Sequence, residues 1–229
     1  MKPNQRTGIT REDLERDDVR TRLLNTPLAN LLLSDEQLAA SMEAALRTAP
    51  TPGDLWLFAY GSLVWNPMVC FTERVPGRIF GYHRRFCLHS RINRGTPEQP
   101  GLVLALEKGG SCSGMLYRIP AAAKTKELRL LWRREMLMNS YVPRWLPARG
   151  DKGAVIPALA FVVNPHCSGY AGRLPETEIV RRLTQAHGLY GSGTDYLKAT
   201  AAGLAASGLR CRHLETLVKQ LAAHTNPAR

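Results

Sequence analysis

The segment Lys126–Met138 combines an apolar helical face with a carboxylate. Four of its residues recur at helical spacing and share one face: Leu128, Leu131, Trp132 and Glu135. Glu135 therefore lies on the face that should pack against the core. If Glu135 is partly desolvated, its pKa rises toward the range useful for a general base. The ordinary alternative, which the spacing leaves open, is that Glu135 lies at the margin of the stripe or pairs with an arginine.

A second candidate is the segment Phe58–Trp65. Here an apolar stretch runs into Gly61 and Ser62, which allow a sharp turn with exposed backbone N–H groups. Such groups can bind a carboxylate or stabilise a developing oxyanion. The segment is not a G-x-S-x-G nucleophile elbow, because Tyr60 stands in place of the first glycine. On these residues alone, an ordinary turn at the end of a strand remains the alternative.

Motifs for metals and nucleotides are incomplete. Residues Gly109–Gly114 have the glycine spacing of a P-loop, but Met115 stands where lysine is required. A glycine hairpin turn between two strands is predicted there instead. The six histidines include no H-E-x-x-H motif and the five cysteines no C-x-x-C motif. We therefore expect no metal and no cofactor, and the odd number of cysteines favours a reducing cytoplasm.

The composition is that of a globular, strongly basic protein. Of the 229 residues, 44% are hydrophobic and 22% are charged, which excludes disorder throughout. The formal net charge of +12 favours anionic partners, namely acidic small molecules, nucleic acid or lipid headgroups. The longest nearly uninterrupted apolar run, Ala154–Val163, is shorter than the roughly 20 residues of a membrane span. The acids among residues 1–22 argue against a targeting signal.

The elements that must position these residues change in character near residue 50. Capping patterns at Thr10 and Ser34 predict two helices within residues 1–47, before a proline-rich segment at 49–53. Beyond it, strands are predicted at Leu55–Tyr60, Arg78–Leu88, Leu102–Glu107, Cys112–Ile119 and Ala158–Val163. Further helices are expected at Lys126–Met138, Glu176–His187 and Asp195–Leu221, the last broken at Gly208. A block of strands with one inserted helix predicts an α+β fold with a curled or barrel-like sheet.

Several motifs resemble the ChaC family of glutathione-specific γ-glutamylcyclotransferases. In chain order they are Tyr60–Leu63, Gly81–Phe86, Arg94–Gly101, Gly114–Arg118, Leu131–Met136, Asn164–His166 and Tyr196–Leu197. The resemblance implies a ChaC-like domain over residues 54–229, a small β-barrel-like mixed sheet with flanking helices. An N-terminal helical extension and linker over residues 1–53 precedes it. Two positions depart from the family pattern, Ala59 in place of a glycine and Gly193 in place of an asparagine.

The resemblance also implies an activity and a site. Glutathione would be cleaved to 5-oxoproline and Cys-Gly, as the substrate's α-amine attacks its own γ-carbonyl, with Glu135 as general acid and base. The turn after the first strand would bind the γ-glutamyl group, with three backbone N–H groups as donors. Arg94 and Tyr141 are further candidates for substrate binding. The implied binding residues are Ala59, Tyr60, Gly61, Ser62, Leu63, Val64, Arg94 and Tyr141.

Two alternatives remain at this point. A cyclotransferase for another γ-glutamyl amide would keep the chemistry and change the substrate. A basic RNA- or anion-binding module without turnover would instead use arginines that occur with no acid between them. These are Arg74, Arg78, Arg84, Arg85, Arg91 and Arg94. Because aromatic residues make up only 7% of the chain and no stacking motif occurs, we expect glutathione as partner, with no nucleic acid and no membrane. The oligomeric state stays open between a monomer and a weak dimer.

Overall fold

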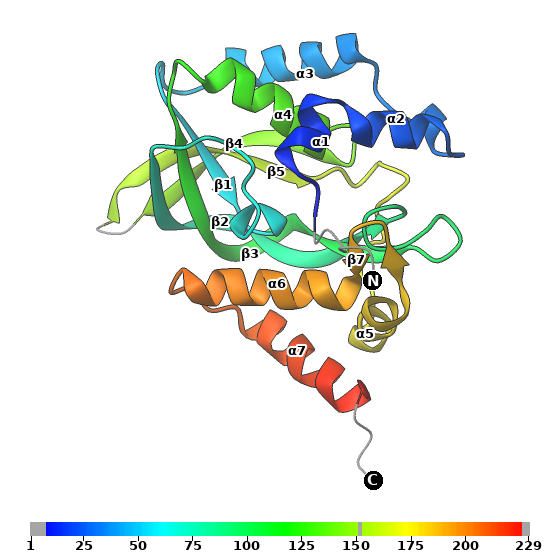
Figure 1. Ribbon diagram of the computed structural model, residues 1–229. Coiled ribbons are helices and arrows are strands. Elements are labelled where there is room, and N and C mark those ends of the chain that lie inside the picture. Colours follow the sequence, from blue (N-terminus) through cyan, green and yellow to red (C-terminus); the bar gives the residue numbers. More distant parts are fainter. Residues whose placement is uncertain (1–7, 151–152, 226–229) are drawn as a thin grey trace.

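A computed structural model describes residues 8–150 and 153–225 of the chain (Figure 1). Among these residues, five strands close into a barrel in the order β1-β3-β2-β4-β5. The strands are β1 (Leu55–Ala59), β2 (Glu73–Ser90), β3 (Gly101–Ile119), β4 (Tyr141–Gly150) and β5 (Val155–Val163). Successive neighbours in this order are antiparallel, and β5 closes the barrel by pairing in parallel with β1. The predicted α+β class with a barrel-like mixed sheet is confirmed.

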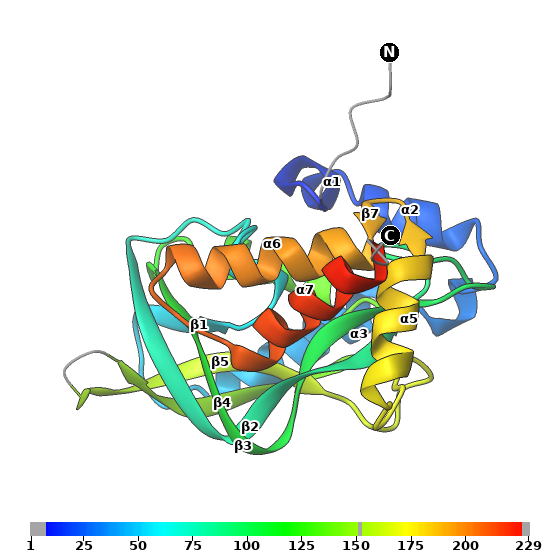
Figure 2. The ribbon, with the colours of Figure 1, turned by 90° about the horizontal axis from the view of Figure 1, so that it is seen from below.

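Helices cover two sides of the barrel. On one side lie α3 (Asp35–Arg47) and α4 (Lys124–Glu135), and on the other α5 (Glu176–Gln185), α6 (Gly193–Ala206) and α7 (Arg212–Thr225) (Figures 1 and 2). The short elements are α1 (Arg11–Glu15), α2 (Asp18–Leu24), η1 (Ala29–Leu31), η2 (Ser62–Val64), β6 (His187–Gly188) and β7 (Gly191–Ser192). No helix in the described part of the chain is long and apolar enough to cross a membrane.

One apolar core joins the barrel to the helices before and after it. Strand β5 contains the strand predicted at Ala158–Val163 and begins three residues earlier, at Val155. Phe161 of this strand packs edge-on against Trp132 of α4, with 5.3 Å between ring centroids. The apolar face of α3 contributes Leu38 and Met42 to the same core. Residues before 53 therefore share a core with the barrel, and the division of the chain at residue 53 stays a prediction.

The N-terminal helices begin where the capping patterns predict them. Thr10 and Asp13 form a capping box at α1, and Ser34 and Gln37 form one at α3. The expectation of two helices was wrong, because α2 lies between them. Asp17 separates α1 from α2 by adopting a left-handed backbone conformation, which interrupts the helical hydrogen bonds.

The predicted hairpin turn at Gly109–Gly114 is wrong. Strand β3 continues through these residues and pairs with β2 along almost its whole length. Gly109 and Gly110 have positive φ angles, and so does Gly81 on the facing strand, where the pairing register shifts. Because glycine tolerates this conformation, both strands bend together there instead of reversing. The structure thus has one bent strand where the sequence predicted two.

Strand β4 was not predicted from the sequence. It contains Pro143 and Pro147 and shows no regular alternation of apolar and polar residues. Proline lacks the N–H group that a central strand normally needs, so it weakens any strand prediction. In the barrel β4 pairs with β5 along its length and with β2 only over Ile79 and its two preceding residues.

Gly114 marks a close approach of β3 to the end of β1, and its replacement should destabilise the barrel. A Cβ atom there would lie 2.3 Å from the carbonyl oxygen of Ala59 and 2.8 Å from the ring of Phe58. We expect Gly114→Ala to lower the free energy of unfolding by about 1–3 kcal/mol, the usual range for overpacking. Gly150→Ala is the control, because its nearest neighbour would be the Ile156 side chain at 3.4 Å. Equal losses for both variants in urea denaturation would contradict this account.

Candidate active site

Glu135 is the last residue of α4 and lies at the C-terminal end of the apolar face of this helix. Leu128, Leu131 and Trp132 are buried on that face, as the spacing predicted. The Glu135 side chain is 13% exposed, and its Oε1 atom lies 3.0 Å from Nε of Arg134. Both interpretations of the sequence therefore apply, since Glu135 is largely desolvated and also pairs with an arginine.

The surroundings of Glu135 favour its protonated form. Burial raises the pKa of its carboxyl group, and the neighbouring Arg134 guanidinium offsets this only in part. The C-terminal end of a helix gives no compensating attraction, because the helix dipole is negative there. A carboxylate with a raised pKa is a stronger base than an exposed glutamate, which suits it to take a proton from a substrate.

Arg134 connects Glu135 to the turn after β1. Its Nη1 atom donates to the carbonyl oxygen of Asn66 at 2.7 Å, and its Nη2 atom donates to Oγ of Ser62 at 2.8 Å. The guanidinium is 6% exposed. One buried cation therefore fixes the distance between the catalytic candidate on α4 and the turn that was predicted to bind substrate. Arg134 lies within the Leu131–Met136 motif, but no role was predicted for it from the sequence.

The turn consists of Gly61 and the 3₁₀ segment η2. Within it, the N–H groups of Val64 and Trp65 donate to the carbonyl oxygens of Gly61 and Ser62. The first N–H groups of such a segment have no partner inside it. Those of Gly61, Ser62 and Leu63 can therefore donate to a bound oxygen atom, and their part in substrate binding stays a prediction.

Most of the predicted site residues line one cavity of about 190 Å³. They come from the turn, from the end of α4, from β4 and from the loop after β2: Tyr60, Gly61, Ser62, Leu63, Arg94, Glu135 and Tyr141. Ala59 and Val64 are not among the lining residues; their side chains are buried in the core. If these two residues contribute to binding, they do so by shaping the turn.

Three tyrosines line the cavity together with Glu135; Tyr60 and Tyr196 are buried, and Tyr141 is partly buried. Tyr60 donates its hydroxyl to the carbonyl oxygen of Phe161 at 2.7 Å, and Tyr141 donates to that of Leu104 at 3.4 Å. The hydroxyl of Tyr196 accepts a hydrogen bond from the backbone of Leu104. Burial raises the pKa of all three hydroxyls, so each is neutral near pH 7 and acts through hydrogen bonds. Tyr196 belongs to a motif that resembles the family, but no role was predicted for it from the sequence.

Arg94 is buried and lies between aromatic rings. Its guanidinium lies 5.4 Å from the ring centroid of Tyr196 and 6.0 Å from that of Trp65, and it donates to the carbonyl oxygen of Tyr190. Burial lowers its pKa. These contacts give Arg94 a structural role in the cavity wall, and its predicted attraction for a substrate carboxylate stays a prediction.

The arginines between positions 74 and 94 do not form one surface patch. Arg84 is buried and donates to the carbonyl oxygens of Tyr60 and Ser113, and Arg94 is buried as well. Arg84 thus supports the site by fixing the backbone of Tyr60. Two of the six cations proposed for an RNA surface are directed inward.

Gly193, which departs from the family pattern, lies at the start of α6 against α5. A Cβ atom there would lie 2.9 Å from the Cα atom of Leu183 and 3.1 Å from its carbonyl oxygen. The two helices therefore approach closely because this residue has no side chain. Within the described residues, no three His, Cys, Asp or Glu side chains are arranged to hold a metal ion.

The N-terminal segment supplies cavity residues that the sequence did not indicate. These are Gly8, Ile9, Val19 and Leu23. They are small or apolar and have no recognisable chemistry, so only the tertiary structure shows that they belong to the site.

The fold is that of the γ-glutamylcyclotransferases. A crystal structure of the yeast glutathione-specific enzyme superposes with a TM-score of 0.68, at 21% identity, over 74% of this chain and 96% of that one. A crystal structure of YkqA from Bacillus subtilis gives a TM-score of 0.51 at 21% identity, over 80% of this chain and 59% of that one.

The sequence comparisons are more specific. The family model described as "ChaC-like protein" matches residues 55–224, and the chain therefore belongs to the ChaC family. The glutathione-specific γ-glutamylcyclotransferase of Escherichia coli is 38% identical over 222 residues, covering 96% of both chains. The enzyme of the same name from Schizosaccharomyces pombe is 34% identical, over 61% of this chain and 74% of its own.

The raised pKa of Glu135 has a consequence for stability. The folded state keeps the Glu135 proton at pH values where the unfolded state has lost it, so stability falls as pH rises from the ordinary glutamate range through the raised value. Because glutamine never ionises, we expect Glu135→Gln to be at least as stable as the wild type at pH 7. The difference in free energy of unfolding between Glu135→Gln and the wild type should disappear once the pH falls below the ordinary pKa range of glutamate.

The measurement is urea denaturation of both proteins as a function of pH. A clear loss of stability in Glu135→Gln at pH 7 would show that the ion pair with Arg134 outweighs the cost of burial, and would contradict the prediction.

Proposed function

We propose that this protein is a glutathione-specific γ-glutamylcyclotransferase, a carbon–nitrogen lyase that releases 5-oxoproline and Cys-Gly. The observation that carries the proposal is Glu135, a largely buried carboxyl group with a raised pKa that lines the same cavity as Gly61, Ser62 and Leu63. Membership of the ChaC family and the similarity to the Escherichia coli enzyme of that name support the choice of substrate.

The reaction needs one base, one acid and a folded substrate. The α-amine of the γ-glutamyl group attacks the γ-carbonyl carbon, forming the new C–N bond of a five-membered lactam. The tetrahedral intermediate then collapses, and the bond to the cysteine nitrogen breaks. No water is consumed, and no covalent enzyme intermediate is needed. Bringing amine and carbonyl together in one cavity lowers the barrier by several kcal/mol in well-oriented reactions.

Glu135 performs both proton transfers in this proposal. The free α-ammonium has a pKa of about 8, so a base with a raised pKa is better matched to it than an exposed glutamate. The ionised carboxylate takes one proton from the ammonium as the amine attacks, and the resulting carboxylic acid gives it to the cysteine nitrogen as the old C–N bond breaks. The attacking nitrogen loses a second proton as the lactam forms, and this proton ends on the released amino group, which leaves as an ammonium ion. Arg134 stabilises the ionised form between cycles through its 3.0 Å contact.

The turn stabilises the charge that develops on the γ-carbonyl oxygen. N–H groups of Gly61, Ser62 and Leu63 point toward the cavity side of the turn in this proposal and donate to the oxyanion, the kind of interaction that often contributes most to catalysis. The neutral hydroxyls of Tyr60 and Tyr141 bind polar groups of the substrate. None of these steps uses a metal or an organic cofactor.

The remaining expectations about partners and location belong to the same proposal. We propose no nucleic acid or membrane partner and either a monomer or a weak dimer. All five cysteines are free, which supports the cytoplasmic location. The inward direction of Arg84 and Arg94 weakens the alternative of an RNA-binding module.

The substrate assignment is tested by incubating the purified protein with reduced glutathione, oxidised glutathione and γ-glutamyl-alanine. We expect 5-oxoproline and Cys-Gly from reduced glutathione, unaffected by a chelator, and much slower release from the other two. Equal or faster release from γ-glutamyl-alanine would favour a cyclotransferase for another γ-glutamyl amide. Absence of 5-oxoproline from all three would overturn the proposal.

The role of Glu135 is tested by substitution. Glu135→Gln keeps the size of the side chain but removes the base, so kcat should fall by about 10²–10⁴-fold, the range typical of general acid–base groups. Glu135→Asp should also be slow, because withdrawing the carboxylate by one methylene disturbs the geometry of proton transfer.

Glu107→Gln is a matched control. Glu107 is 14% exposed and pairs with Arg85 at 3.3 Å, much as Glu135 pairs with Arg134, but it does not line the cavity. Single-turnover rates should remain near the wild-type value for folded Glu107→Gln. Similar rate losses in the two glutamine variants would remove Glu135 from its assigned role.

A further inference from the structure

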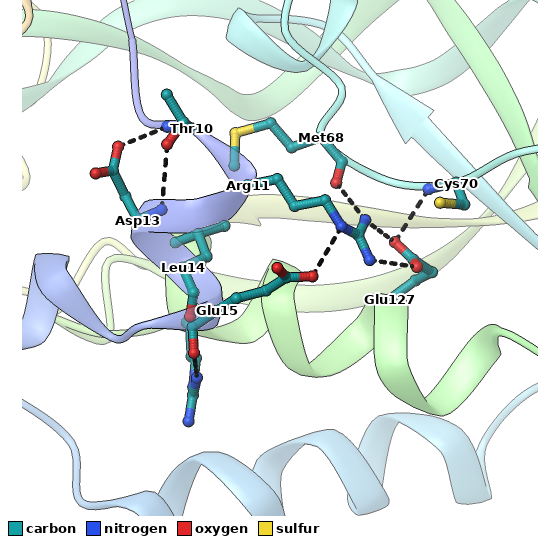
Figure 3. A network of polar contacts seen from close by, with 9 residues as sticks. Thr10, Arg11, Asp13, Leu14, Glu15, Met68, Cys70 and Glu127 are labelled. Carbon is teal, nitrogen blue, oxygen red and sulfur yellow. Dashed lines mark hydrogen bonds and ion pairs between the residues drawn. The ribbon is translucent and has the colours of Figure 1, made fainter.

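An ion pair between a partly buried arginine and a buried glutamate joins the N-terminal segment to α4. Arg11 of α1 and Glu127 of α4 form two parallel contacts, Nη1 to Oε2 at 2.7 Å and Nη2 to Oε1 at 2.9 Å (Figure 3). Arg11 also donates to the carbonyl oxygen of Met68, and Glu127 accepts from the backbone N–H of Cys70. The Glu127 side chain is only 2% exposed. These bonds give the buried carboxylate the partners that its desolvation requires.

The segment anchored in this way forms part of the cavity. Residues Gly8, Ile9, Val19 and Leu23 line it together with Glu135. Ile9 also packs with Leu14 and with Leu130 of α4 in a small apolar cluster. The segment therefore contacts α4 through an ion pair and through apolar packing, and it presents only apolar or small residues to the cavity.

Asn66 links the segment to the Glu135 pair. Its Nδ2 atom donates to the carbonyl oxygen of Ile9 at 2.9 Å, and its own carbonyl oxygen accepts from Arg134 at 2.7 Å. Arg134 in turn lies 3.0 Å from Glu135. A continuous series of polar contacts thus connects the N-terminal segment to the carboxylate. The segment is also tightly fitted, since a Cβ atom on Gly8 would lie 2.9 Å from Nδ2 of Asn66.

We propose that residues 8–23 form a fixed wall of the active site, anchored by Arg11 and Glu127, that excludes water from Glu135 and orients Arg134 through Asn66. Arg11 and Asn66 are positioning residues in this account, because neither reaches the reacting atoms. The wall lies outside residues 55–224, the part that matches the family model. Its effect on turnover rests on the proposed function, whereas its effect on Glu135 ionisation does not.

The titratable and charged groups near Glu135 come from several elements. They are Arg134 beside it on α4, Tyr60 after β1, Tyr141 of β4 and Tyr196 of α6. The wall residues that line the cavity carry no titratable group, so the wall acts on Glu135 by keeping water away and by fixing Arg134. Loosening the wall hydrates the carboxylate and lowers its pKa toward the ordinary range.

The test is Arg11→Gln, which removes the cation that pairs with Glu127. The ionisation of Glu135 is followed by ¹³C NMR of labelled glutamate carboxyl groups, with the signal assigned by its loss in Glu135→Gln. We expect the titration midpoint to fall by roughly 0.5 pH or more. The acidic limb of kcat/KM should move in the same direction, and KM for glutathione should rise several-fold.

Three further variants make the result specific. Arg11→Lys keeps the positive charge and should move the midpoint less than Arg11→Gln does. Asn66→Ala removes the side-chain bond to Ile9 and should lower the midpoint even if Arg11→Gln does not fold. Arg118→Gln is the control, since Arg118 also pairs with two carboxylates, Asp54 and Glu73, but does not line the cavity.

The outcomes separate the two proposals. The proposed wall would be wrong if the titration midpoint of Glu135 were unchanged in both Arg11→Gln and Asn66→Ala. It would also be wrong if Arg118→Gln changed that midpoint equally. A wild-type protein that forms no 5-oxoproline while these midpoints still shift would overturn the proposed function and leave the wall in place.

Discussion

Arg134 joins the end of α4 to the turn after β1 by pairing with polar groups whose burial would otherwise be unfavourable. Its fork of N–H donors contacts the carboxylate of Glu135, the hydroxyl of Ser62 and the carbonyl oxygen of Asn66. Each acceptor would carry a desolvation penalty if left unpaired, and the guanidinium would carry a larger one. Only arginine has enough donors in a rigid plane to satisfy three separate groups. The end of α4 and the turn after β1 are therefore held in one geometry.

The parts of this arrangement that depend on local patterns could be predicted from the sequence. Glu135 was identified because its spacing from Leu131 and Trp132 is a property of any helix, and the structure buries that face. The apolar run that forms β5 and the capping boxes at Thr10 and Ser34 are also local, since their partners lie within a few residues. The turn at Gly61 followed from residue types alone.

The remaining parts depend on contacts between distant segments. No periodicity relates Arg11 to Glu127 or Ile9 to Asn66, so the N-terminal wall could not be predicted. Paired glycines at positive φ bend β3 in the middle of a strand, yet the same residues are typical of a hairpin turn. The residue types there fit either a hairpin turn or a bend within one strand, and the pairing of β3 with β2 produces the bend.

The parallel pairing of β5 with β1 has a consequence for how the chain folds. Trp56 lies opposite Ala158 in this pairing, so the barrel cannot close until strands from opposite ends of the sheet region have met. Contacts of such long sequence separation incur loop-closure entropy before they contribute favourable energy, which slows folding. During synthesis, the edge of β1 that pairs with β5 therefore stays unpaired until β5 has left the ribosome. An unpaired strand edge can pair with another chain during this interval, which is a route to aggregation.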